Sequence, residues 1–126
     1  MDMKAIESDL KMNYIFFPEC LVKRECVIQN GSLNVDIKKN IEKNKDHEFT
    51  LKVVLKVEKN DLQVNVTCVA GFSFMGEDKD IEENLVRKNG MAIVFPFLRS
   101  QVTLLTSQPN MTPVVLPAIN INKILE

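Results

Sequence analysis

The histidine and the cysteines are the first residues to test for chemistry. The 126-residue chain has one histidine, His47, and three cysteines, Cys20, Cys26 and Cys68. Together they would supply the ligands of a Cys3His zinc site, but Cys20 and Cys26 are six positions apart and no C-x-x-C pair occurs. We therefore expect no metal site, reduced cysteines that pack as small apolar residues, and an exposed His47 within a charged run.

Paired acids are the other candidates for catalysis. Asp78 and Asp80, followed by Glu82 and Glu83, stand where a helix is expected to begin. Carboxylates at that place are explained by the favourable interaction with the helix dipole. The glycines lack the spacing of a phosphate-binding loop, and nothing resembles a nucleophile site. We expect a protein that is not an enzyme and that needs no cofactor.

Charge and hydropathy exclude further classes of protein. The chain has 16 Lys and Arg against 17 Asp and Glu, a net charge of -1, so it lacks the positive field that recruits nucleic acid. The most apolar run, Met91 to Leu98, is far shorter than the roughly 20 residues that span a bilayer. Met1 to Lys4 lacks the apolar stretch of a secretory signal. We expect a single cytoplasmic domain over residues 1–126, without membrane insertion.

Apolar residues alternate with polar ones in the middle of the chain. The alternation has a period of two over Phe49 to Glu58 and again over Leu62 to Phe74. The intervening Lys59-Asn60-Asp61 is a turn signal. The two segments therefore predict a long antiparallel hairpin.

Further strands are expected upstream of this hairpin. Leu33 to Ile37 alternates with the same period, and another strand is expected within Tyr14 to Ile28. Pro18 interrupts that strand, which favours an edge position or a bulge. Lys38 to Glu48 mixes four lysines with three acids, and we interpret it as a solvated loop between strands.

The apolar period changes after Gly76 and indicates a helix. The pair Asn89-Gly90 is expected to interrupt this helix, and a second helical stretch is expected from about Met91 to Ser107. Pro96 falls early in the second stretch, where a helix start or a kink tolerates proline. The apolar side of that stretch is expected to consist of Val94, Phe97, Leu98, Val102 and Leu105.

The segment after Gln108 is apolar and rich in proline. Pro109, Pro113 and Pro117 favour an extended backbone, and apolar side chains stand between them. Loops are usually polar and lie on the surface. Two interpretations remain open: the segment closes the core, or it borders a groove that holds an apolar peptide.

Three segments resemble the SecB family of protein-export chaperones. Gly90 to Val102 resembles a family helix with a leucine-phenylalanine-proline-tyrosine turn and a following arginine, here Val94-Phe95-Pro96-Phe97 and Arg99. Thr112 to Ile121 resembles a family loop that ends in proline-x-asparagine-phenylalanine. Gly71 to Gly76 resembles the last family strand before the helix.

The resemblance implies an α+β fold, in which a four-stranded antiparallel sheet is followed by a long interrupted helix that packs on it. It also implies a homotetramer, built as a dimer of dimers with helices between the dimers. Because this sequence runs only a few residues past Ile121, we expect a truncated form that lacks the C-terminal helix and acidic tail of the family.

The resemblance further implies an ATP-independent chaperone, a holdase, that binds unfolded polypeptides through apolar grooves for protein export. Export members dock on the SecA motor ATPase through acidic residues of the sheet. The equivalent positions here hold Gln63, Asn65 and Thr67, which argues against SecA docking. The alternatives are a dedicated chaperone of an antitoxin in a toxin–antitoxin system and a scaffold subunit with the same fold.

By this resemblance the client groove lies between the sheet and the proline-rich loop. The residues expected to contact client peptide are Phe72, Phe74, Val114, Val115 and Leu116. The residues expected at a helix or oligomer interface are Phe95, Phe97, Arg99 and Val102. For each of the apolar residues, burial in the core is the alternative interpretation.

Overall fold

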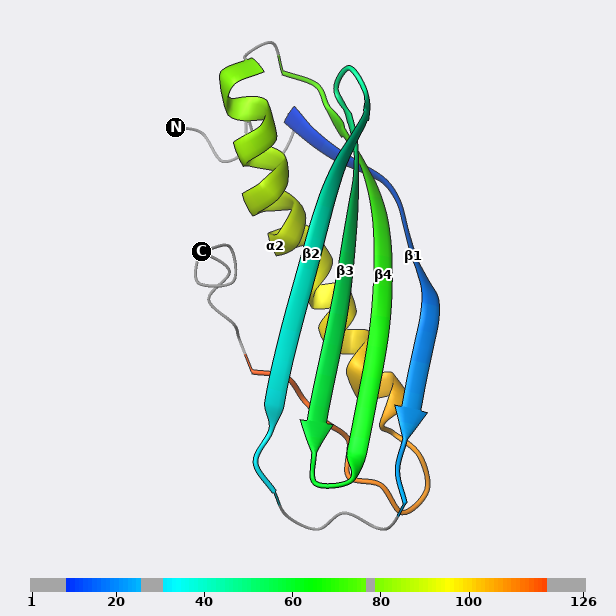
Figure 1. The fold of residues 1–126 in the computed structure, drawn as a ribbon. Coiled ribbons are helices and arrows are strands. Elements are labelled where there is room, and N and C mark those ends of the chain that lie inside the picture. Colours follow the sequence, from blue (N-terminus) through cyan, green and yellow to red (C-terminus); the bar gives the residue numbers. More distant parts are fainter. Residues whose placement is uncertain (1–8, 26–30, 77–78, 118–126) are drawn as a thin grey trace.

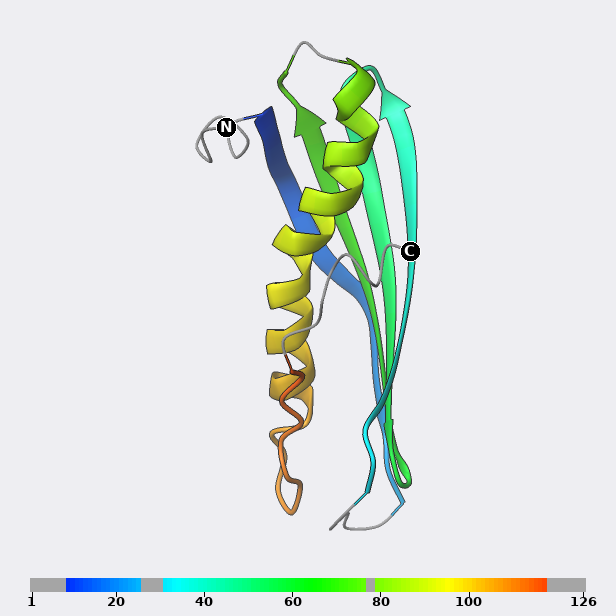
Figure 2. The same ribbon diagram turned by 90° about the vertical axis from the view of Figure 1, so that its left-hand side faces the viewer.

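In the part of the chain that the computed structural model describes, residues 9–25, 31–76 and 79–117, a four-stranded antiparallel sheet carries a long helix on one face (Figures 1 and 2). The elements are β1 (Leu10–Lys23), β2 (Asn34–Lys45), β3 (Glu48–Lys59), β4 (Leu62–Phe74) and α2 (Lys79–Leu105). The strand order is β1-β4-β3-β2, which confirms the predicted α+β class. Cys26, Asp78, Ile121 and the side chain of Asp80 lie outside the described residues.

The predicted hairpin is present as β3 and β4. Its register pairs Leu51 with Ala70 and Val57 with Val64, and all four side chains are fully buried. Asn60, with φ 54°, takes the left-handed backbone conformation in the turn, which asparagine adopts more readily than most residues. Alternate residues of a strand point to the same face, so the period of two produces one continuous apolar surface.

β1 is an irregular edge strand, as Pro18 predicts. Its register with β4 shifts between Met12 and Tyr14, and again between Phe16 and Glu19, a stretch that contains Pro18. Proline has no N–H to donate to a neighbouring strand, so a sheet edge or a bulge accommodates it at the lowest cost.

The interpretation of residues 38–48 as a loop is wrong. β2 runs through this segment to Lys45, and the turn to β3 contains only Asp46 and His47. β2 forms the second edge of the sheet, where a lysine-rich strand is tolerated and discourages pairing with other chains. Ile37 and Ile41 supply its partly buried contacts with the core.

α2 is continuous through Asn89-Gly90, where the sequence predicts an interruption. Gly90 is buried, and an added Cβ would lie 3.4 Å from Leu51 Cδ2 and 3.6 Å from Phe72 Cε2. The glycine therefore serves close approach of the helix to the sheet and does not break the helix. Pro96 also lies inside the helix, where its ring is exposed.

The buried positions of the helix repeat every four residues. This row consists of Glu82, Val86, Gly90, Val94, Leu98, Val102 and, just after α2, Thr106, and the adjacent Met91 and Phe95 are buried beside it. Each step of four residues rotates the contact by about 40°, so the helix crosses the sheet obliquely. Phe97 lies off this row and is 44% exposed, which corrects its predicted place on the apolar side. Within the described residues, no helix combines the length and apolar character that crossing a membrane requires.

Candidate peptide-binding groove

The proline-rich segment after α2 folds back beside the helix. Met111 N–H donates a hydrogen bond to Gln108 O at 3.2 Å, and Asn110 takes the left-handed conformation with φ 58°, so the chain reverses here. Residues 112–117, which we call the return segment, then run back along the last turns of α2 (Figure 2).

Side chains of the helix hold the return segment by its backbone. Arg99 Nε donates to Leu116 O at 3.1 Å, and Thr103 Oγ1 donates to Val114 O at 2.9 Å. Thr106 Oγ1 accepts a hydrogen bond from Val114 N–H at 2.8 Å. These contacts satisfy backbone groups that are shielded from water and determine which side chains of the segment point inward.

The reversal is also tied to the sheet. Arg24, one residue beyond β1, donates from Nη1 to Asn110 O at 2.7 Å and from Nη2 to Pro109 O at 3.3 Å. Gln101 Nε2 of α2 lies 3.5 Å from Cys20 Sγ of β1. The helix, the reversal and the end of β1 therefore form one connected region.

The side chains of the return segment alternate between core and solvent. Val114 and Leu116 are buried, whereas Val115 between them is 67% exposed. Leu104, on the outer side of α2, is 68% exposed. A groove of about 540 Å³ runs between the helix and the return segment. Its lining consists of Pro96, Arg99, Ser100, Thr103, Leu104, Ser107, Val115 and Leu116.

This groove has apolar rims and contains small polar residues. Val115 and Leu104 present apolar surface, while Ser100 and Ser107 are short and leave room for the side chain of a bound peptide. Arg99 is the only charged residue among the described residues that line the groove, and its Nε is engaged by Leu116 O. The arrangement suits the apolar side chains of an extended polypeptide.

Of the five residues predicted to contact a client, one is exposed. Phe72 and Phe74 are buried in the core beneath α2, together with Val114 and Leu116. Val115 alone of the five is open to solvent, and Leu116 borders the groove from the buried side. Contact with a client stays a prediction for all five.

The four residues predicted at a helix or oligomer interface separate into three environments. Phe95 and Val102 are buried in the core of this chain, and Phe97 is exposed. Arg99 bonds to the return segment of its own chain. An interface between copies stays a prediction for this set.

Sequence reasoning missed several residues of the groove region, among them Leu104, Thr103 and Thr106. Leu104 lies seven positions after Phe97, two helical turns along the same flank, and this spacing was the available signal. Thr103 and Thr106 gave no signal, because their hydroxyls acquire partners only when the return segment lies against the helix.

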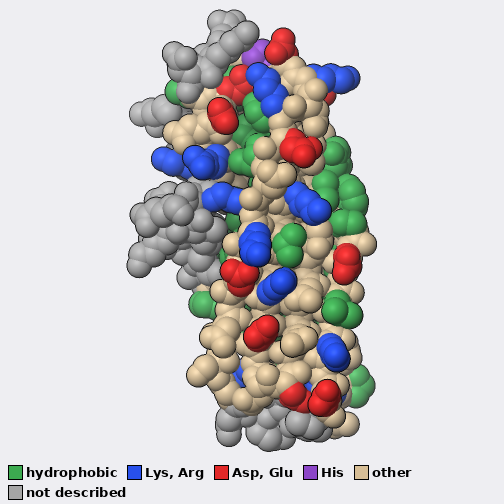
Figure 3. Space-filling model, in the orientation of Figure 1, with side chains coloured by type: hydrophobic (Ala, Val, Ile, Leu, Met, Phe, Trp, Pro, Cys, Tyr) green, Lys and Arg blue, Asp and Glu red, His purple; other side chains and the backbone are tan. Residues whose placement is uncertain are grey.

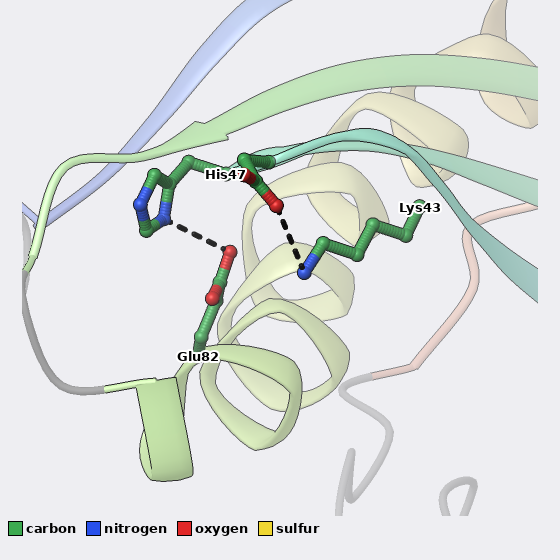
Figure 4. Close-up of polar contacts among 4 residues, drawn as sticks. Lys43, His47 and Glu82 are labelled. Carbon is green, nitrogen blue, oxygen red and sulfur yellow. Dashed lines mark hydrogen bonds and ion pairs between the residues drawn. The ribbon is translucent and has the colours of Figure 1, made fainter.

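A buried carboxylate ties the start of α2 to the turn between β2 and β3 (Figure 4). Glu82 is 3% exposed, and its Oε1 lies 3.2 Å from Nδ1 of His47. His47 is only partly exposed, which corrects the expectation of an exposed histidine within a charged run. Beside this turn, Nζ of Lys43 in β2 lies 3.9 Å from Oδ1 of Asp46. Among the described residues, no three His, Cys, Asp or Glu side chains are grouped to hold a metal ion.

A solved structure shares this architecture. It is the SecB-like chaperone Rv1957 of Mycobacterium tuberculosis in complex with a ChAD peptide from the Rv1956 HigA1 antitoxin. Its TM-score with this chain is 0.73 at 12% identity, and the match covers 93% of this chain and 92% of that one. This chain has the SecB-like fold.

Sequence comparison finds a more similar protein of unassigned role. The uncharacterized protein MJ0357 of Methanocaldococcus jannaschii is 30% identical over 97 residues, which cover 71% of this chain. The match spans 63% of the length of that relative. No family model matches the chain.

Proposed function

We propose that this chain is an ATP-independent chaperone that holds an extended, apolar segment of a client polypeptide in the groove between α2 and the return segment. The observation that carries the proposal is the pair of exposed apolar rims, Val115 and Leu104, on either side of a groove of about 540 Å³. The SecB-like fold supports it, because a protein of that fold binds a peptide of an antitoxin.

The physical basis is the removal of apolar client side chains from water. A fully buried aliphatic or aromatic side chain contributes about 1.5–3 kcal/mol, and ordering a flexible side chain costs about 0.5–1.5 kcal/mol. Fixing the backbone of the client adds a further cost. Several side chains must therefore bind together, and a groove with few polar contacts would accept many apolar sequences.

We propose a dedicated client, such as an antitoxin, in preference to general protein export. Gln63, Asn65 and Thr67 of β4 alternate with residues that face α2, so they lie on the opposite face of the sheet. These positions carry no charge, which supports a receiving partner other than SecA. General export is the alternative, and strong suppression of the aggregation of an unrelated protein in the experiment below would support it.

We also propose that the chain assembles as a homotetramer through its helices. Phe97 supports this proposal, because it is exposed on α2 and does not line the groove. A large aromatic side chain gains about as much from burial between subunits as in a core. Mass measurement in solution tests this point directly.

The test of the groove is the double substitution Leu104→Asp with Val115→Asp. Light scattering follows the aggregation of a chemically denatured, unrelated protein, and size exclusion with mass detection follows assembly. Because a groove with few polar contacts would bind many apolar sequences weakly, we expect the wild type to suppress the scattering of this unrelated protein only when it is in excess. The double variant should need roughly 30-fold more protein for the same suppression, since two apolar contacts of at least about 1 kcal/mol each are lost.

Met75→Asp is the matched control, because Met75 is 65% exposed and does not line the groove. A double variant of normal mass that suppresses scattering as well as the control overturns the groove assignment. Wild-type protein of normal mass that fails to suppress scattering, yet binds an antitoxin-derived peptide, indicates a dedicated client. Failure with both probes leaves a scaffold subunit and refutes the chaperone proposal.

A further inference from the structure

The groove between α2 and the return segment lies in a part of the chain that has no acids. From position 84 to position 117 the sequence contains no Asp or Glu, whereas it carries Arg87, Lys88 and Arg99. On the surface of a helix, a side chain meets those three or four positions away. For Arg99 these neighbours are Phe95, Pro96, Val102 and Thr103. No acid of its own helix is therefore placed to neutralise Arg99.

The face of the sheet that is turned away from α2 differs in this respect. Figure 3 shows Lys and Arg side chains interspersed with Asp and Glu on this face. Lys56 of β3, for example, is the register partner of Asp36 of β2, and both side chains are exposed. Opposite charges on neighbouring strands compensate each other. The groove, with Arg99 as the one charged residue of its described lining, is therefore the better place for an anionic group of a client.

The contact with the return segment orients Arg99 and leaves part of its guanidinium group free. Nε donates to Leu116 O at 3.1 Å. Among the described residues, Nη1 and Nη2 of Arg99 form no hydrogen bond or ion pair. Two adjacent N–H donors match the two oxygens of a carboxylate, and a guanidinium group that is already held loses less side-chain entropy when it binds. Arg99 is therefore suited to a carboxylate of a bound peptide.

The return segment shows how an extended chain aligns with this part of α2. Val114 O bonds to Thr103 and Leu116 O bonds to Arg99. These four residues of helix rise about 6 Å, which two residues of an extended chain also span at about 3.3 Å each. Arg99 and Leu104 are separated by about 7.5 Å along the helix axis. A client that lies beside the return segment therefore covers the distance from Leu104 to Arg99 with about two residues.

We propose that Arg99 binds the carboxylate of a client Asp or Glu two residues from the apolar client side chain that lies between Leu104 and Val115. This inference rests on the proposed chaperone function and specifies its client: an extended segment in which one residue separates an apolar residue from an acid. Residues two apart on an extended chain point to the same side, so both face the groove. Such a contact gives the chaperone a preference among apolar sequences that the apolar rims alone do not distinguish.

The test uses two labelled peptides with blocked ends that share a central run of three apolar residues. The run is flanked on both sides by Asp in one peptide and by Asn in the other, so a flanking residue lies two positions from the middle of the run in either orientation. Fluorescence anisotropy at low salt gives the Kd of each peptide. We expect the wild type to bind the Asp peptide roughly threefold to tenfold more tightly. Added salt should reduce that preference.

The ratio of the two Kd values separates charge recognition from the structural role of Arg99. Arg99→Gln should bring the ratio close to one, whereas a loosened return segment alone would weaken the binding of both peptides and leave the ratio unchanged. Arg99→Glu should bind a third peptide, with Lys in the flanking positions, more tightly than the Asn peptide. Lys88→Gln is the control and should keep the wild-type ratio, because Lys88 is exposed on α2 and lies outside the groove lining.

Equal binding of the Asp and Asn peptides by the wild type refutes the role of Arg99 and leaves the groove intact. A preference for Asp that survives Arg99→Gln places the acid elsewhere and overturns the assignment. A preference that Lys88→Gln reduces as much as Arg99→Gln reflects the general positive charge of the helix and overturns it as well. Absence of binding by both peptides at the highest protein concentration refutes the proposed function, and with it this inference.

Discussion

Replacing Thr106 by valine tests how the return segment is held. Valine has nearly the volume of threonine, so the change removes one hydroxyl without opening a cavity. The Thr106 hydroxyl is fully buried and accepts a hydrogen bond from Val114 N–H at 2.8 Å. Val114 is itself buried, so in the variant its N–H faces a methyl group and has no water to replace the lost acceptor.

The expected cost follows from that orphaned donor. A buried polar group without a partner costs about 1–3 kcal/mol, so Thr106→Val should lower the free energy of unfolding by that amount. The hydroxyl also donates a hydrogen bond to Val102 O at 2.8 Å. In the variant this carbonyl still accepts a hydrogen bond from the backbone N–H of residue 106, at 3.1 Å. Loss of that second bond therefore adds little.

Urea unfolding at one fixed protein concentration measures the effect, since stability of an oligomer depends on concentration. Thr112→Val is the matched control, because Thr112 is exposed in the same segment and its substitution should change stability by less than about 0.5 kcal/mol. Thr106→Val should also weaken peptide binding, because it loosens the segment that presents Val115. Equal stability of the two variants would refute the hydrogen-bond argument.

Two further predictions concern the core. Gly90→Ala should raise stability by about 0.5–1 kcal/mol through helix propensity, because the new Cβ meets Leu51 and Phe72 at 3.4 Å or more. Gly90→Val should lower the free energy of unfolding, because it adds methyl groups in the same contact. A lower free energy of urea unfolding for Gly90→Ala than for the wild type would contradict the packing described. Burial raises the pKa of Cys68 from 9.0 to about 11, so at pH 8 its thiolate fraction is roughly 100-fold below that of an ordinary cysteine. Iodoacetamide should therefore modify exposed Cys20 first, and equal rates in peptide mass spectrometry would count against a closed core.

The β3–β4 hairpin and the edge strand β1 could be predicted from the sequence, because the signals for them lie within single segments of the chain. The alternation in Phe49 to Glu58 and Leu62 to Phe74 belongs to single strands, and the backbone of a strand places every second residue on one face. Pro18 likewise acts through its own missing N–H, so the edge position and the irregular register of β1 were predictable.

β2 was harder to predict because it contains few apolar residues. α2 was harder to predict because its buried positions shift around the helix axis along its length. Among the lysines and acids of β2, Ile37 and Ile41 are too few to establish a period. In α2 the buried row from Glu82 to Thr106 shifts by about 40° at every step, which distributes buried positions around the helix axis. Gly90 then resembles a helix end, although it lies inside α2 where the helix packs closely on Leu51 and Phe72 of the sheet.

The sequence by itself determined the order of strands and helix, the edge position of the proline-containing strand, and the apolar character of the return segment. Only the tertiary structure decided that Val114 and Leu116 enter the core while Val115 faces solvent. The reason is that hydrogen bonds from Arg99 and Thr103, and the one accepted by Thr106, orient the backbone of the segment. Those partners lie on a different element, so no local pattern of residues 112–117 contains the information.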